Sequence, residues 1–256
     1  MSRRTILRCA GVVLLSWTLV ACGDSGAQSA ANATSTICPD VRGAEAILWD
    51  LYNGIPRVDT SVLPPDIPPV GGSYSHPAFP LLGFIYPPGW APQTIAGGIG
   101  QVGVNLIRQD NQAIWREESL TVNGVPGVQT VRDTEFQSLL AFLGQQAGQV
   151  QTVCENAGQT DAGGGIIVSF SNIMIRVGNS TAVINASVTP FPGLPNSSVR
   201  VKVVASPTAE FPDRAIDTFL AIDWQMLIGD SSNLFDRDGD GWRDRVDEFP
   251  DDPTRH

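Results

Sequence analysis

The feature that most constrains the fold is the order in which helical and extended patterns of apolar residues follow one another along the chain. Helical spacing of apolar residues occurs three times, at 40–53, from Asp133 and from Pro212. Between these helices the pattern is extended, in runs at 82–86, 102–108, 112–120, 166–177, 181–189 and 199–205. The proline-rich stretch 56–80 predicts irregular structure. Helix, strands, helix, strands, helix predicts an α+β fold with a largely antiparallel sheet covered by helices.

Polar residues within these elements indicate which faces meet water. Asp133 is expected to cap the second helix. Arg200 and Lys202 alternate with valines, so one face of that strand is expected to be wet. Asp217 and Asp223 are expected to form the polar edges of the last helix.

Composition excludes several classes of protein. Hydrophobic residues make up 42% of the 256 positions, which excludes a mostly disordered chain. Charged residues are 16%, and no apolar run reaches the length of a membrane span, so neither a coiled coil nor a transmembrane helix fits. The 16 basic residues against 26 acidic ones predict no nucleic-acid partner, because phosphate binding needs a basic surface.

The first 21 residues have the pattern of an export signal. Three arginines precede a mostly apolar stretch that is too short to span a membrane, and the stretch ends in LVAC at Cys22. This tetrapeptide resembles the lipobox of bacterial lipoproteins, which implies cleavage before Cys22 and acyl chains on that residue. Two or more acyl chains hold a protein stably at a bilayer. The export route, Sec or twin-arginine, stays open. With Gly23 and Asp24 after the cysteine, the resemblance to lipoproteins implies sorting to the outer membrane rather than the inner one.

Two cysteines remain in the mature body, Cys38 and Cys154, once Cys9 is removed and Cys22 is lipidated. In an oxidising compartment they should form a disulfide, which would contribute about 4 kcal/mol if unstrained. The alternative is two buried free thiols. Residues 22–37 are small and polar, as in a flexible tether.

Aspartates near the C terminus have the spacing of calcium ligands. The expected ligands occupy positions 1, 3, 5, 7, 9 and 12 of a twelve-residue loop: Asp236, Asp238, Asp240, the carbonyl of Trp242, Asp244 and Asp247. Gly241 at position 6 allows the sharp bend that such a loop needs. Without a cation these carboxylates repel one another, so calcium is the expected cofactor. A solvated acidic tail is the alternative, because three arginines interleave with the acids.

Residues 236–253 resemble a bacterial thrombospondin type 3 repeat, in which such a loop precedes a proline and calcium shapes the backbone. An EF-hand is the near alternative. That motif normally has Glu at position 12, a hydrophobic residue at position 8 and a long flanking helix. Here position 12 is Asp247, position 8 is Arg243, and Pro250 would end a flanking helix early. The shorter ligand at position 12 predicts weak binding, sufficient where calcium is abundant.

The central region resembles the PsbP-like fold, an α/β/α sandwich found in photosynthetic proteins and in bacterial lipoproteins. The resemblance covers roughly residues 79–228 and depends on GFIYPPGW, on GVNLIRQDNQAIWREESL, and on the order of the elements that follow. That family is mostly non-catalytic, so the resemblance implies a binding or assembly role.

Several patterns are similar to pieces of catalytic sites, but their contexts argue against them. His76 lies in the proline-rich loop with no nucleophile motif nearby. The GxGxxG letters that end at Gly103 precede an extended run, where a dinucleotide loop needs a helix. We interpret the acidic pairs, Glu117 with Glu118 and Asp133 with Glu135, as solvated or capping charges. The tryptophans interpreted as core residues rather than a sugar platform are Trp90, Trp115 and Trp224.

The sequence therefore predicts four segments: a signal peptide at 1–21, a lipidated tether at 22–37, an α+β domain at 38–229 and a calcium-binding tail at 230–256. We expect a lipid-anchored envelope protein that binds an unidentified protein or envelope polymer and is not an enzyme. Two alternatives stay open. One is a hydrolase of envelope polymers that uses acidic residues of the central domain, and the other is a purely structural surface protein.

Overall fold

The structure is a computed structural model that describes residues 33–55, 70–97 and 100–228, together with residues 249, 252, 254 and 255. The predicted lipidation site at Cys22 and the predicted calcium ligands lie outside these residues. Within the described part of the chain, no helix is both long and apolar enough to cross a membrane.

Seven strands form one antiparallel sheet in the order β3-β4-β5-β9-β8-β7-β6, and β1 and β2 form a separate hairpin. The strands are β1 (Gly72–His76), β2 (Phe79–Tyr86), β3 (Trp90–Ile95), β4 (Val102–Arg108), β5 (Ile114–Asn123), β6 (Val150–Asp161), β7 (Ile167–Val177), β8 (Ser180–Pro190) and β9 (Asn196–Pro207). The helices are α2 (Ala44–Tyr52), α3 (Val128–Leu143), the short η2 (Ala147–Gln149), α4 (Phe211–Arg214), the π-helical η3 (Ala215–Leu220) and α5 (Ala221–Ile228). The α+β prediction is confirmed.

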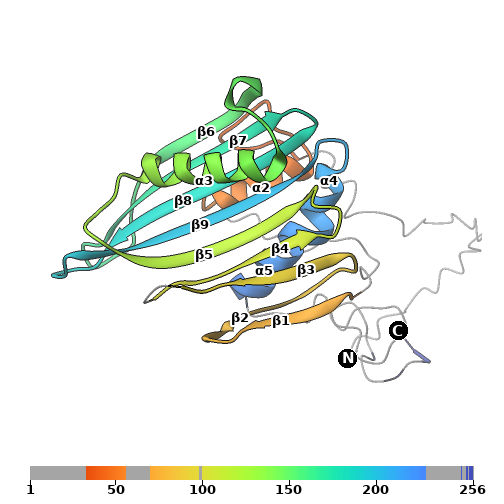
Figure 1. The fold of residues 1–256 in the computed structure, drawn as a ribbon, viewed down its shortest axis with the longest axis horizontal. Helices are drawn as coiled ribbons and strands as arrows, with labels where there is room; N and C mark the ends of the chain where they lie inside the picture. The colour runs from red at the N-terminus through yellow and green to blue at the C-terminus, as the bar shows by residue number, and fades with distance from the viewer. Residues whose placement is uncertain are drawn as a thin grey trace, which may run out of the picture.

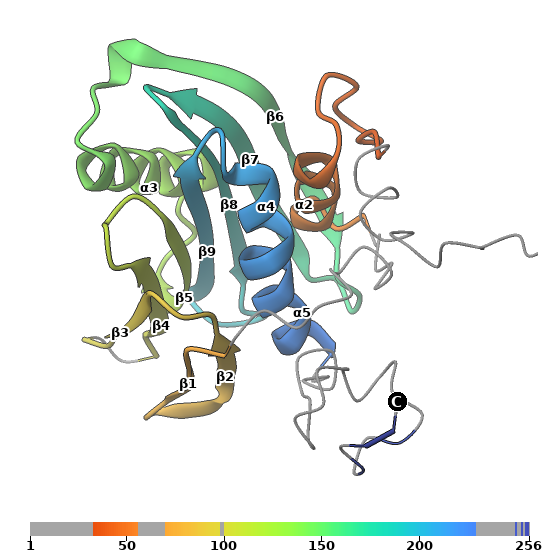
Figure 2. The same ribbon diagram turned by 90° about the vertical axis from the view of Figure 1, so that its right-hand side faces the viewer.

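Helices lie on both faces of the large sheet (Figures 1 and 2). On one face, α3 packs on β7, β8 and β9 over a core that includes Ile184, Val201 and Leu140. On the other face, α2 and the α4–η3–α5 segment enclose a second core, which includes Trp49, Trp115 and Phe219. Because both faces are covered, strands such as β8 and β9 bury side chains of both alternating sets.

The disulfide predicted between Cys38 and Cys154 is present in the structure, with Cα atoms 6.3 Å apart. It joins the segment before α2 to the edge strand β6. Asp50 of α2 adds a second tie, because its carboxylate accepts hydrogen bonds from the hydroxyls of Ser35 and Thr36. The N-terminal segment is thereby fixed to one edge of the sheet, at β6.

The sequence missed three strands, each for a physical reason. β1 lies in the stretch 56–80, which its prolines predict to be irregular. Within that stretch, residues 56–69 lie outside the described residues. β3 contains Pro92, which an edge strand tolerates because one side of its backbone needs no ladder partner. β6 is the other edge strand and has few apolar residues, so it lacks the alternation of a half-buried strand.

The expected start of α3 was also wrong. The helix begins at Val128, directly after Gly127, and Asp133 lies inside it rather than at its cap. The exposed Asp133 pairs instead with Arg132. Gly144 ends the helix in a left-handed conformation, with φ of 65°.

Candidate functional site

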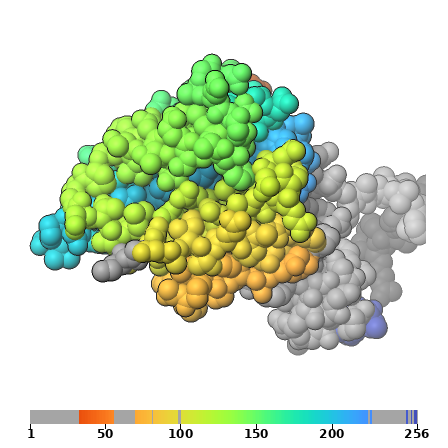
Figure 3. Space-filling model, viewed as in Figure 1, coloured from red at the N-terminus to blue at the C-terminus, as the bar shows by residue number. Residues whose placement is uncertain are grey.

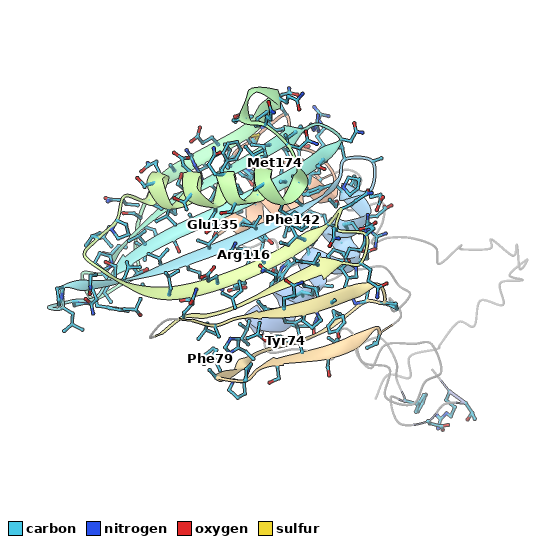
Figure 4. All side chains as sticks on the ribbon, in the orientation of Figure 1. Tyr74, Phe79, Arg116, Glu135, Phe142 and Met174 are labelled. Carbon is cyan, nitrogen blue, oxygen red and sulfur yellow. A yellow bond between two sulfur atoms is a disulfide. The ribbon has the colours of Figure 1, made fainter. Side chains whose placement is uncertain are left out.

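A cavity of about 150 Å³ is lined by residues of α3 on one side and of the strands β4, β5 and β9 on the other. Asn105 of β4 pairs in register with Arg116 of β5, and both face the residues Glu135 and Phe142 of α3. Figure 4 shows Arg116, Glu135 and Phe142 close together at the edge of α3, and Figure 3 shows the hollow between that helix and the strands. The cavity exists because α3 covers β7 to β9 and stops short of β4.

A short chain of charges borders this cavity. The guanidinium of Arg116 pairs with Glu118 through one amino group, and its Nη1 lies 3.1 Å from Glu135 Oε2. Glu118 Oε1 also accepts a hydrogen bond of 2.7 Å from Gln101 Nε2. Arg116 and Glu118 share a face because they are two residues apart on one strand. The single guanidinium therefore faces two carboxylates.

Burial shifts the pKa of Glu135. Its partial burial raises the pKa of the carboxyl, the charge of Arg116 offsets part of that rise, and the charge of Glu118 adds to it. The pKa of Glu135 thus lies above its usual range although a guanidinium is adjacent. Its charge is held less firmly than that of a carboxylate in a well-satisfied ion pair.

Three buried polar atoms at the cavity have no hydrogen-bond partner among the described residues. They are Arg116 Nε, a donor, and two acceptors, Asn105 Oδ1 and the Glu135 Oε2 that forms the ion pair with Arg116. Buried polar groups are normally paired, so an unpaired donor beside an unpaired acceptor needs an explanation. A ligand amide would satisfy both, because its carbonyl accepts from Nε–H and its N–H donates to Oδ1. Ser138, which also lines the cavity, already donates to the carbonyl of Thr134.

A second charged cluster is buried on the opposite face of the sheet. Lys202 Nζ lies 2.7 Å from Asp223 Oδ1 and 3.2 Å from Glu117 Oε2. Trp115 Nε1–H donates to the same Asp223 oxygen at 2.9 Å, and the half-exposed Arg200 pairs with Glu117. Asp223 is fully buried, so a substrate has no access to it. This cluster positions α5 against the sheet.

The pKa values of this cluster follow from burial and charge together. Burial lowers the pKa of Lys202, but the charges of Asp223 and Glu117 outweigh burial, and the pKa lies above its usual value. Burial raises the pKa of Glu117, but the charges of Lys202 and Arg200 outweigh it, and the pKa is lowered. Burial raises the pKa of Asp223 despite Lys202.

An in-register row of polar residues extends this cluster across the sheet. Neighbouring strands pair the members in the order Asn156, Asn172, Asn185, Lys202 and Glu117. The amides of Asn172 and Asn185 both donate to the carbonyl of Tyr52, at 3.2 and 2.7 Å. Tyr52 is the last residue of α2, whose final carbonyls have no partner within the helix. The row therefore caps α2 from the sheet.

The structure separates the acidic residues that the sequence presented as pairs. Glu117 and Glu118 point to opposite faces of β5, toward Lys202 and Arg116 respectively, and both are buried, so interpreting them as solvated charges was wrong. The predicted wet face of β9 was also wrong at Lys202, which is buried against α5, although Arg200 is exposed.

The structure also shows where other residues named in the sequence analysis lie. Asp223 is buried rather than at a polar edge of the last helix. Trp90 and Trp115 are core residues, as expected, whereas the side chain of Trp224 is not among those described. His76 is buried, with Nδ1 accepting from the amide of Ala78 and Nε2 facing the carbonyl of Ile95. Gly103 lies inside β4, so an extended strand follows the glycines as predicted.

Comparison with known proteins finds no matching family model and no matching curated protein. Among solved structures, the Ran-binding protein Mog1p of Saccharomyces cerevisiae is similar over 57% of this chain and 85% of its own, with 12% identity and a TM-score of 0.29. A likeness at that TM-score carries no argument about this chain.

Proposed function

We propose that this chain is a lipid-anchored envelope protein whose domain binds a partner non-catalytically at the cavity beside α3. The observation that carries the proposal is the unpaired donor of Arg116 next to the unpaired acceptor of Asn105. Both come from the middle of a paired hairpin, so they are held in place before a ligand arrives. Preorganised groups of this kind favour binding because little order is lost on association.

The cavity fits a small group better than a whole metabolite. Its volume of about 150 Å³ is below the roughly 300–1,000 Å³ of typical small-molecule sites. An amide carried by a larger partner, such as a peptide backbone or a carboxamide side chain, matches both the size and the two polar atoms. Ile107 and Phe142 supply apolar contacts beside them.

The remaining parts of the proposal are supported by the sequence. The LVAC tetrapeptide supports lipidation at Cys22 and residence in the cell envelope, and Gly23 and Asp24 after it support the outer membrane. The element order and the helices on both faces of the sheet are compatible with a PsbP-like sandwich. The chemistry of the donor set at 236–247, with alternating carboxylates and one glycine, supports a structural calcium ion in the tail.

The binding site is tested by placing a photo-crosslinking residue at Ser138, with Gln137 as the matched control. Ser138 lines the cavity, whereas Gln137, which is also exposed, does not. We expect a discrete adduct in the native envelope from position 138 and none from 137. Asn105→Leu should abolish the adduct without lowering stability, because the substitution removes an unpaired buried carbonyl. Equal adducts from both positions, or an adduct that persists in Asn105→Leu, would refute the site.

Calcium binding is tested by calorimetric titration of the ion into the mature chain. We expect a saturating heat signal in the range of about 10⁻⁴ to 10⁻³ M. Asp238→Ala should abolish the heat, whereas Asp251→Ala, outside the twelve-residue loop, should retain it. A wild-type chain that gives no signal with millimolar calcium excludes the site.

A further inference from the structure

Four loops lie at one end of the large sheet, and three of them contain only glycine, alanine, proline and large apolar residues; the fourth, between β3 and β4, includes Gln101. The three apolar loops are the β5–α3 loop GVPG at 124–127, the β6–β7 loop AGGGI at 162–166 and the β8–β9 loop FPGLP at 191–195. We call these three loops the apolar tip. Val125 is 64% exposed and Leu194 is 63% exposed, which makes them two of the most exposed large hydrophobic residues described.

The strand pairing brings the three loops together. The amide of Gly124 donates to the carbonyl of Pro195 at 2.7 Å, which joins the β5–α3 and β8–β9 loops. Ile167 follows the β6–β7 loop, and its strand pairs with β8 close to the β8–β9 loop. The tip lies at the left end of the molecule in Figure 1.

Loops at the opposite end of the same sheet are polar. The β4–β5 turn contains Asp110 and Asn111, the β7–β8 turn contains Asn179, and the β9–α4 turn contains Glu210. Asp110 and Glu210 both pair with Arg108. The two ends are built from similar short connections, so the apolar composition belongs to one end only and turn formation does not require it.

The tip satisfies much of its own backbone. The amide of Ala162 donates to the carbonyl of Ile166 at 2.9 Å, and the amide of Leu194 donates to the carbonyl of Phe191 at 3.1 Å. Its prolines have no N–H to leave unpaired. Internal hydrogen bonding is the condition for polypeptide to leave water for a lipid phase without a large cost.

We infer that the apolar tip inserts into the interfacial region of the membrane to which Cys22 is anchored. The inference rests on the proposed lipidation. The disulfide holds the N-terminal segment at Cys154, seven residues or about 23 Å along β6 from Asp161 at the tip. Eleven residues from Cys22 to Ala33 span up to about 38 Å. That reach is similar to the length of β6, twelve residues or about 40 Å, so the anchor can extend along the strand toward the bilayer that the tip meets.

The chemistry of the tip favours lipid over a charged partner. No residue of the three loops carries a charge, and the bordering Asp161 uses Oδ1 to accept a hydrogen bond from the amide of Gly163. Binding should therefore depend weakly on anionic lipids and on salt, in contrast to a basic membrane-binding patch. Valine, leucine and isoleucine side chains at loop ends suit shallow insertion beside the lipid headgroups.

The test uses the lipidated mature chain in phosphatidylethanolamine–phosphatidylglycerol vesicles, with an environment-sensitive fluorophore on Leu194→Cys. Asn179→Cys, at the polar end, is the matched control. We expect blue-shifted emission from position 194, quenched by spin labels near the lipid headgroups, and unchanged emission from position 179. Val125→Ser in the labelled chain should weaken insertion about tenfold. The similarly apolar and exposed Phe79, outside the tip, serves as the control through Phe79→Ser, which should have no effect.

Each remaining outcome decides the inference. Identical emission from positions 194 and 179 overturns it. A blue shift that depends on protein concentration without vesicles shows a contact between two copies and also overturns it. Failure of the anchor is distinguished separately, because co-sedimentation with vesicles and intact mass report acylation of Cys22 whether or not the tip inserts.

Discussion

Replacing Lys202 by methionine leaves a fully buried Asp223 without its cation. The Nζ to Oδ1 distance is 2.7 Å, and the Coulomb attraction over that distance is about 6 kcal/mol at an effective dielectric constant of about 20. Burial of the two ions offsets part of this attraction. Removing one partner of a buried pair typically costs about 3–5 kcal/mol, because the other charge stays desolvated. We expect Lys202→Met to lower the free energy of unfolding by that amount.

Arg200→Met is the matched control. Arg200 lies two residues away on the same strand and also pairs with Glu117, but its side chain is 50% exposed, compared with 9% for Lys202. An ion pair with one exposed partner contributes about 0–1 kcal/mol, so this variant should lose no more than that. Burial is the main difference between the two substitutions.

The loss in Lys202→Met should depend on pH. Burial raises the pKa of Asp223 even while Lys202 is present, and removal of that charge raises the pKa further. A carboxyl with a raised folded-state pKa contributes stability that is present below its unfolded pKa and lost as pH rises through the folded value. The destabilisation should therefore be largest at neutral pH and should shrink as pH falls toward the ordinary range of aspartic acid.

Urea unfolding of the oxidised protein, followed by tryptophan fluorescence, measures these differences. Adding Asp223→Asn to Lys202→Met should restore at least about 1–2 kcal/mol, because the neutral amide keeps an acceptor for Trp115 without a buried charge. Equal losses in Lys202→Met and Arg200→Met, or a loss below about 1 kcal/mol in the former, would refute the argument from burial.

Three further predictions concern other parts of the domain. Replacing Cys38 and Cys154 together by alanine should lower the free energy of unfolding by about 4–5 kcal/mol, and urea midpoints equal to the oxidised wild type would contradict this. Asn172→Ala removes two hydrogen bonds to the end of α2, one of them to the carbonyl of Tyr52. We expect this variant to lower the free energy of unfolding by about 1–3 kcal/mol and to speed amide exchange in α2. Unchanged exchange would count against the polar row as the cap of α2. Glu135→Gln mimics the protonated carboxyl, whose raised pKa means that stability is lost as pH rises, so thermal melts should show this variant gaining on wild type from acidic to neutral pH and matching it in acid.

The hairpin turns carry positional information that hydrophobic periodicity does not. A turn at Asp110 and Asn111 requires residues whose numbers sum to 221 to pair across β4 and β5, and Asn105 with Arg116 is such a pair. The donor and acceptor of the candidate site could therefore have been placed side by side from the sequence. Their lack of partners could not, because it depends on how far α3 extends over the strands.

Contacts between elements that are distant in the chain could not be predicted from local sequence patterns. β5 pairs with β9, which brings Glu117 opposite Lys202 although 85 positions separate them in the sequence. Asp223 joins them only after α5 docks. A lone lysine or aspartate in an amphipathic pattern indicates a solvated face, since a buried charge is tolerated only with a partner. The pattern rule failed here because the partners come from three separate elements.

The apolar tip could have been predicted from the sequence by grouping the loops according to the end of the sheet to which they belong. Consecutive turns of an antiparallel meander alternate between the two ends of the sheet, so every second loop belongs to the same end. Loops read one at a time show glycine and proline, which indicate only a turn. When the loops are grouped by end, three of those at one end, 124–127, 162–166 and 191–195, lack polar side chains, whereas the turns at Asp110 and Asn179 at the other end are polar. Turn chemistry applies equally to both ends and cannot produce that difference, so the contrast calls for a surface that only one end of the sheet meets.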